Sequence, residues 1–266
     1  MRTREPLATF APDSVEVDEI VPAANREPRR GVTTPDMLVL HYTGMANAEK
    51  AVRWLSLTES KVSCHYVVDE VGHVTQMVPE RLRAWHAGVS CWHGETDLNS
   101  ASVGIEIHNP GHEDGYHDFP SAQIAAVIAL SRDIINRNDI AASRVLAHSD
   151  IAPLRKIDPG EKFPWHALAA AGIGAWVPPS PVVAGARDLG PGDAGAGVAT
   201  AQAMFAAYGY HLPVTAQFDR LTEHVVRAFQ RHFRPARCDG RLDLSTLATL
   251  ERLIAATGPG APTLAE

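Results

Sequence analysis

The chain has 266 residues, of which 45% are apolar and 21% are charged, a composition that excludes a disordered or collagen-like protein. Its 24 basic and 31 acidic residues give a net charge of −7, which argues against a broad electrostatic attraction to nucleic acid or to an anionic membrane. The sequence holds 13 histidines but only four lysines, and ten of the histidines fall between His41 and His166. This uneven placement points to the first two-thirds of the chain as the place to look for chemistry.

The N-terminal 21 residues carry two arginines and then mix polar with acidic side chains, without an apolar run of signal-peptide length. No stretch of the chain approaches the roughly 20 apolar residues that a membrane span requires. The three cysteines are an odd number without CxxC spacing, which is more typical of reduced thiols than of a disulfide framework. These features predict a cytoplasmic protein without membrane or nucleic-acid partners, and they leave the oligomeric state open.

Strands and helices are expected to alternate after an irregular lead-in over residues 1–35, which is rich in Pro, Glu and Arg. The apolar run at 37–40 is typical of a strand buried on both faces, and apolar spacings of three and four predict a helix at 48–57. The later elements are strands at 65–68, 73–78, 103–107 and 145–148, a long helix over 124–135 entered through Pro120, and a short helix at 166–171. This alternation predicts an α/β domain with a mixed central sheet flanked by helices.

A change in composition divides the chain after about residue 176. Residues 177–197 are rich in Pro and Gly, which is typical of a linker. Three amphipathic segments follow at about 198–208, 221–233 and 244–254, and they predict a small three-helix domain over 198–266. The first domain is therefore expected to span 1–176, with its core at about 36–176.

Three side chains suited to metal binding lie at or beyond the ends of predicted strands. His41 closes the first strand, His148 closes the last one, and Asp158 follows ten residues later. Two imidazoles and a carboxylate are the ligands of an open zinc site, whose fourth position takes a water molecule. A single histidine at a strand end is more often a structural hydrogen-bonder, so these residue types alone leave both interpretations open.

Five short phrases stand in order within residues 36–176. They are Leu40-His41-Tyr42-Thr43, Ser63-Cys64-His65-Tyr66, Ala84-Trp85-His86-Ala87-Gly88-Val89-Ser90, Ser102-Val103-Gly104-Ile105-Glu106-Ile107 and the segment 148–160. In these phrases the chain resembles the AmpD/AmiD family of zinc-dependent N-acetylmuramoyl-L-alanine amidases, which is related to the peptidoglycan recognition proteins. The resemblance implies a mixed sheet flanked by helices, with zinc in a groove at one edge.

The resemblance also implies roles for individual residues. It assigns His41, His148 and Asp158 as zinc ligands, Glu106 as the catalytic carboxylate and Lys156 as a catalytic cation. A carboxylate beside a metal can take a proton from the attacking water and pass it to the leaving nitrogen, and an ammonium group can stabilise the oxyanion. The alternatives are an outward-facing strand residue for the glutamate and an exposed loop cation for the lysine.

Three further residues are predicted to contact the substrate: His86, Tyr42 and Asn109. The resemblance implies that His86 lies on the wall of the groove, and two roles for its side chain remain open. It either touches the substrate or holds a hydrogen bond behind a metal ligand. His65 is expected to be a structural hydrogen-bonder.

The segment beyond the linker is similar to the three-helix peptidoglycan-binding domain that is often appended to cell-wall hydrolases. Members of that family usually carry Asp-Gly and Phe-Gly turns before the second helix, and Phe218-Asp219-Arg220-Leu221 departs from this pattern. Wall binding and a purely packing role therefore both remain open.

Together these features predict zinc-dependent hydrolysis of the amide bond between N-acetylmuramic acid, in its 1,6-anhydro form, and L-alanine of the stem peptide, during cytoplasmic peptidoglycan recycling. The expected cofactor is Zn²⁺ and the expected partner is a muropeptide or peptidoglycan fragment. One alternative is an amidase that acts on intact or periplasmic peptidoglycan. A second is a non-catalytic muropeptide-binding protein, which is disfavoured because all three ligand positions are filled. A generic zinc peptidase is disfavoured as well, because the chain has no His-Glu-x-x-His motif.

Overall fold

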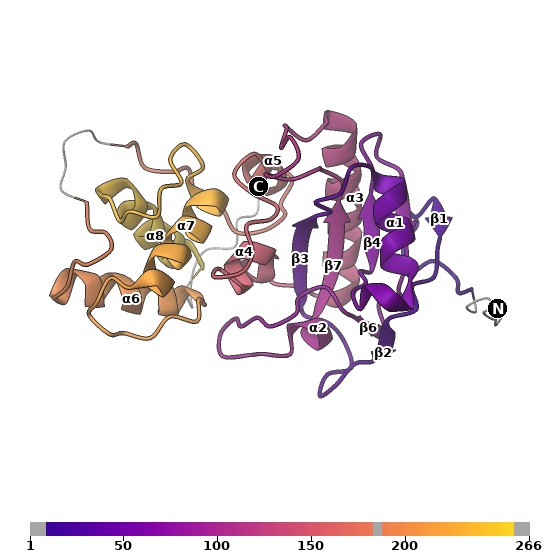
Figure 1. Ribbon diagram of the computed structural model, residues 1–266, viewed down its shortest axis with the longest axis horizontal. Helices are drawn as coiled ribbons and strands as arrows, with labels where there is room; N and C mark the ends of the chain where they lie inside the picture. Colours follow the sequence, from indigo (N-terminus) through magenta and orange to yellow (C-terminus); the bar gives the residue numbers. More distant parts are fainter. Residues whose placement is uncertain (1–8, 183–187, 258–266) are drawn as a thin grey trace. The chain divides into compact units, whose positions relative to one another are not determined.

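The computed structural model describes residues 9–182 and 188–257, which form two compact units (Figure 1). Among the described residues, the first unit consists of 9–88 with 97–141, and the second of 89–96 with 142–182 and 188–257. Parts of the predicted lead-in, linker and C-terminal domain, at 1–8, 183–187 and 258–266, lie outside the described residues. Residues 142–176 share the second unit with the C-terminal helices because helix α4 (His148–Ile151) packs against helix α7 (Arg220–Phe233).

A mostly parallel sheet forms the centre of the first unit, where the strands run in the order β1-β5-β4-β7-β3. Strand β7 is parallel to both β3 and β4, whereas β5 is antiparallel to β4. The predicted α/β fold with a mixed sheet is therefore confirmed. The strands of this unit are β1 (Glu19–Ile20), β2 (Arg26–Pro28), β3 (Met37–Tyr42), β4 (Tyr66–Val68), β5 (Val74–Gln76), β6 (Leu82–Ala84) and β7 (Ser102–Ile107).

Helices α1 and α3 cover opposite faces of this sheet (Figure 1). Val67 of β4 packs in one cluster with Leu55 of α1. The neighbouring Tyr66 points to the other face, because side chains alternate along a strand. Its hydroxyl donates to Glu80 at 2.6 Å, and Glu80 forms an ion pair with Arg137 of α3. The helices of the first unit are α1 (Ala48–Ser56), α2 (Leu98–Ala101) and α3 (Ser121–Asn138), with a 3-10 turn at Thr58–Ser60.

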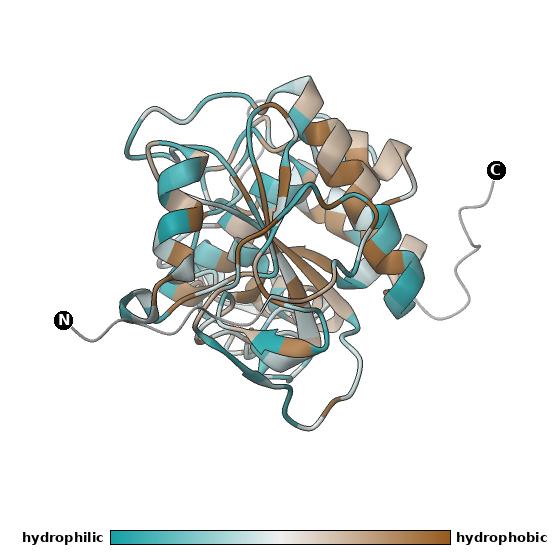
Figure 2. Ribbon diagram, turned by 90° about the vertical axis from the view of Figure 1, so that its right-hand side faces the viewer, coloured by the Kyte–Doolittle hydropathy of each residue, from teal (hydrophilic) through white to brown (hydrophobic). Residues whose placement is uncertain are grey.

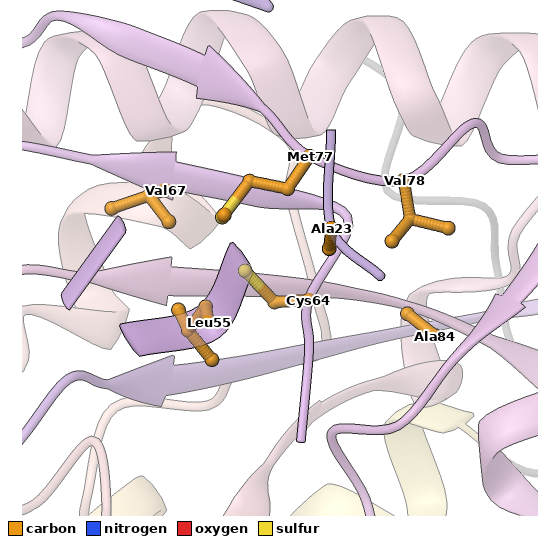
Figure 3. Close-up of a cluster of buried hydrophobic side chains, with 7 residues drawn as sticks. All are labelled: Ala23, Leu55, Cys64, Val67, Met77, Val78 and Ala84. Atoms are coloured by element: carbon orange, nitrogen blue, oxygen red, sulfur yellow. The ribbon is translucent and has the colours of Figure 1, made fainter. Parts of the chain in front are cut away.

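The face of the sheet under α1 is packed with apolar side chains (Figure 3). The cluster consists of Ala23, Leu55, Cys64, Val67, Met77, Val78 and Ala84. Figure 2 likewise shows hydrophobic residues gathered on the central strands. Burial of this apolar surface contributes on the order of 25 cal/mol per Å².

The lead-in is more regular than its composition predicts. Ala23 contributes to the core, β1 pairs in parallel with β5, and β2 pairs antiparallel with β6. The prediction of an irregular segment was therefore wrong for these residues. The two strands have only two and three residues, so they carry no periodic pattern and depend on partners that are distant in the sequence. Pro120, through which the long helix was predicted to be entered, stands at the N-cap of α3.

The second unit contains the three helices predicted beyond the linker. Helix α7 begins where Asp219 accepts the Thr222 N–H at 2.8 Å, and Phe205 and Phe229 pack edge to face between α6 and α7. The elements of this unit are a 3-10 turn at Ala142–Arg144, β8 (Val145–Ala147), α4 (His148–Ile151), α5 (Trp165–Ala170), α6 (Ala196–Tyr208), α7 (Arg220–Phe233) and α8 (Leu244–Thr257). Among the described residues, no helix combines the length and apolar character needed to cross a membrane.

His65 is a fully buried hydrogen-bonder of the first unit, in agreement with its expected structural role. The Gly104 N–H donates to its Nδ1 at 3.0 Å, so the ring proton lies on Nε2, which donates to the Leu82 carbonyl at 3.0 Å. The Arg29 guanidinium lies 3.2 Å from the same Nε2. Burial, and after it the charge of Arg29, lowers the pKa of His65 to about 3.

This lowered pKa makes the fold sensitive to acid. We predict that the free energy of unfolding falls as the pH decreases from about 6.5 toward 3, because the unfolded chain binds a proton at His65 in this range and the folded chain does not. The contribution of this group is up to roughly 1.4 kcal/mol per pH unit. Denaturant unfolding between pH 7 and 4 should show a shallower dependence for His65→Asn, which keeps an acceptor near the Nδ1 position but does not titrate. Equal pH dependence in the two proteins would contradict the prediction.

Candidate active site

The structure brings together the three residues that were predicted to bind a metal. One ligand atom from each of His41, His148 and Asp158 lies within 4.8 Å of the other two. The three residues are 1%, 3% and 6% exposed. Two imidazoles and one carboxylate in this arrangement match the donor set of an open zinc site. In the parts of the chain that the structure describes, no other group of His, Cys, Asp or Glu side chains meets the same condition.

Strand pairing places Glu106 beside His41. Strands β3 and β7 are parallel neighbours in which these two residues are register partners, so their side chains lie on the same face of the sheet. The Glu106 carboxylate also lies near the apolar cluster. Burial raises the pKa of the Cys64 thiol well above its ordinary value, and the charge of Glu106 raises it further. The predicted catalytic carboxylate is therefore next to a predicted metal ligand and at the border of a water-poor region.

Within the second unit, a loop folds back to bring Asp158 to His148. His148 does not close β8, as the sequence predicted, but begins helix α4 directly after it. The Ser149 N–H donates to the Asp158 carbonyl at 3.0 Å, and His148 Nδ1 lies 3.0 Å from Asp158 Oδ2. Lys156 lies in the same loop, where its N–H donates to the Ala152 carbonyl at 2.9 Å. Its side chain is half-buried.

A chain of hydrogen bonds behind His41 determines which of its nitrogens can face a metal. The Ser102 hydroxyl donates to the Leu98 carbonyl, so Ser102 Oγ can only accept from His86 Nε2, 3.2 Å away. His86 Nδ1 then carries no proton and accepts from His41 Nε2 at 3.0 Å. This polarity leaves the lone pair on His41 Nδ1 for a metal, and a bond of this kind orients a ligating imidazole.

His86, the middle member of these hydrogen bonds, is buried. It is 7% exposed, and its ring packs so closely on β7 that a Cβ on Gly104 would lie 2.5 Å from it. Of the two roles left open by the sequence, this geometry favours the hydrogen bond behind a metal ligand. The sequence did not reveal that Ser102 takes part in these hydrogen bonds, although Ser102 opens one of the five phrases.

Tyr42 and Asn109 were predicted to contact the substrate, and their positions do not support that role. Tyr42 follows His41 in β3, so its side chain points to the opposite face of the strand. Its hydroxyl lies 3.1 Å from His112 Nδ1. Asn109 is fully buried, and its amide bonds to the Gly111 N–H and the His117 carbonyl within its own loop. These contacts fit a structural role in shaping the loop after β7.

A buried His-His-Asp donor set beside a glutamate is typical of metal-dependent hydrolases. Residues 31–161 match the family of N-acetylmuramoyl-L-alanine amidases, and residues 194–250 match a peptidoglycan-binding domain. AmiD of Escherichia coli is 40% identical over 233 residues, which cover 82% of each chain. AmpD of the same organism is 32% identical over 162 residues, or 54% of this chain and 86% of AmpD. The chain belongs to the N-acetylmuramoyl-L-alanine amidase family.

Two solved structures extend the similarity to substrate complexes. One is AmiD of E. coli with anhydro-N-acetylmuramic acid-L-Ala-D-gamma-Glu-L-Lys, which has a TM-score of 0.72 and 38% identity, and covers 86% of this chain and 93% of AmiD. The other is AmpDh3 of Pseudomonas aeruginosa with an anhydromuramic pentapeptide, which has a TM-score of 0.70 and 31% identity, and covers 97% and 100% of the two chains. Both relatives are thus known with an anhydro-muropeptide bound.

The buried position of His86 leads to a test that separates its two roles. We predict that His86→Phe weakens zinc binding by about 10- to 100-fold, because His41 loses the acceptor that orients its ring. Competition with a chromogenic chelator measures this affinity. His86→Asn, which keeps an acceptor near the Nδ1 position, should recover most of it. A raised KM with unchanged zinc affinity would instead assign His86 to the substrate.

Proposed function

We propose that the protein uses zinc, bound by His41, His148 and Asp158, to hydrolyse the amide bond between N-acetylmuramic acid and L-alanine of the stem peptide. The observation that carries this proposal is the convergence of three buried ligand atoms within 4.8 Å in a chain that belongs to an amidase family. The preferred substrate in this proposal carries the 1,6-anhydro sugar. The anhydro-muropeptides bound to AmiD and AmpDh3 support that choice.

The chemistry needs a nucleophile, a proton carrier and stabilisation of the oxyanion. When bound, zinc supplies a water of lowered pKa and polarises the scissile carbonyl. In the proposed mechanism, Glu106 would accept a proton from the attacking water molecule as the water oxygen bonds to the carbonyl carbon, and would deliver this proton to the alanine nitrogen as the C–N bond breaks. The Lys156 ammonium stabilises the negative oxygen that forms in between. The products are a lactyl carboxylate on the sugar and a peptide with a free amino group.

Replacement of Glu106 tests this assignment. We predict that Glu106→Gln lowers kcat by about 10²- to 10⁴-fold, because the amide cannot carry the proton, while zinc content stays at the wild-type level. Mass spectrometry of an anhydro-muramyl tripeptide digest measures the separation of sugar from peptide, and elemental analysis measures the metal. Glu49→Gln, on the exposed side of α1, is the matched control and should behave as wild type. Full turnover by Glu106→Gln, or by wild type after zinc is removed, would refute the mechanism.

The location and physical state of the substrate are a separate part of the proposal. We propose that the enzyme acts on released fragments in the cytoplasm. The free state of all three cysteines is in keeping with a reducing compartment. The second candidate substrate is intact peptidoglycan, which the match of residues 194–250 to a peptidoglycan-binding domain favours.

These two substrates can be compared directly. We expect kcat/KM for soluble anhydro-muropeptides to exceed kcat/KM for isolated sacculi, expressed per cleavable amide bond, by at least about tenfold. This ratio corresponds to a difference of about 1.4 kcal/mol in transition-state stabilisation. Release of new amino termini measures both reactions in the same assay. Comparable rates, together with co-sedimentation of the protein with sacculi, would favour the wall instead.

A further inference from the structure

Asp150 is a buried carboxylate that the mechanism does not use. It lies in helix α4, two residues after His148, and its side chain is fully buried. The Ala147 N–H donates to its Oδ2 at 2.8 Å. Two more contacts come from the C-terminal helical segment of the second unit: the Tyr210 hydroxyl lies 2.7 Å from Oδ1, and His232 Nδ1 lies 2.7 Å from Oδ2.

The direction of these hydrogen bonds follows from the acceptor. An ionised carboxylate has only lone pairs to offer, so the Tyr210 hydroxyl donates and His232 carries a proton on Nδ1. Burial, and after it the charge of Asp150, raises the pKa of Tyr210 well above its ordinary value, which keeps this hydroxyl protonated. Removing a carboxylate from water costs folding free energy unless hydrogen-bond donors compensate for the lost water contacts. Asp150 therefore depends on donors that lie 60 and 82 residues away in the sequence.

Both donors are held rigidly by aromatic neighbours. The His232 ring stacks on Trp165 of α5, with ring centroids 3.7 Å apart. The Tyr210 ring lies edge to face with Trp92 at 5.0 Å and with Phe205 at 5.8 Å. Neither side chain is more than 2% exposed, so neither can rotate away without breaking this packing.

Helix α4, which contains Asp150, depends on neighbouring elements for its helical conformation. Helix α4 has four residues, too few for a helix to be stable by itself. Its contacts with α7 extend beyond Asp150, since His224 Nδ1 lies 3.0 Å from the Pro153 carbonyl in the loop that follows. Because His148 is the first residue of α4, its position depends on the same contacts.

We propose that Tyr210 and His232 of the C-terminal helical segment are positioning residues of the catalytic centre, which act through Asp150 to hold α4 and thereby His148 for the metal. The segment that matches a peptidoglycan-binding domain would then be part of the active-site scaffold and not only an attachment to the wall. This inference rests on the proposed function only in taking His148 as a metal ligand.

Full-length variants that keep the aromatic packing test the inference. Tyr210→Phe and His232→Phe each remove one donor to Asp150. The control is Thr246→Val, which removes a buried hydroxyl that bonds to Gln230 and Arg234 inside the same helical segment without touching Asp150. The two readouts are the zinc dissociation constant from chelator competition, and the hydrogen exchange of the backbone amides at 147–152.

We expect each donor variant to weaken zinc binding by about tenfold, the lower end of the effect seen for groups that orient metal ligands, and to accelerate exchange at 147–152. The Thr246→Val variant should leave both at wild-type values. His232→Asn, which retains a donor near the Nδ1 position, should recover the zinc affinity that His232→Phe loses.

Wild-type zinc affinity and exchange in both donor variants would overturn the inference. An equal loss in Thr246→Val would also overturn it, because the effect would then come from the general stability of the helical segment. Failure of the wild type to bind zinc would count against the proposed function instead. In that case, exchange at 147–152 in the metal-free proteins still decides whether Tyr210 and His232 hold α4.

Discussion

The structure around the candidate metal centre depends on one constraint, which is that each polar side chain withdrawn from water must keep its hydrogen bonds. His41 meets it through the chain His86–Ser102, which ends at a backbone carbonyl. Asp150 meets it through donors from the distant helical segment. In both places the partner that compensates the buried group also fixes its orientation, so compensation and orientation come from the same hydrogen bond.

The same constraint gives the individual histidines different roles, which the composition alone did not distinguish. Burial and Arg29 keep His65 neutral by lowering its pKa to about 3, and a backbone N–H fixes its tautomer. His86 is fixed by Ser102, and His232 by the carboxylate of Asp150. A count of histidines therefore carried little information, because the function of each ring depends on which of its nitrogens the surrounding groups protonate.

Much of the fold was predictable because periodic hydrophobic patterns are local. The strand at 37–40, the helix at 48–57 and the three C-terminal helices were found within a few residues of their boundaries. The short strands β1 and β2 were missed, since two or three residues hold no period and their pairing partners are distant. Tyr42 and Asn109 show the limit for the site: as the neighbour of His41 in a strand, Tyr42 occupies the opposite face, and Asn109 is held by hydrogen bonds inside its own loop.

The sequence by itself determined the family, the residue types of the candidate metal centre and the two patterned regions on either side of the linker, because these are properties of order and spacing along the chain. Only the tertiary structure decided the direction of the hydrogen bonds behind His41, the burial of His86 and the contacts of Asp150 with Tyr210 and His232. The physical reason is that these bonds join groups separated by up to 82 residues. Their energy comes from desolvation in a shared interior, which no local pattern in the sequence encodes.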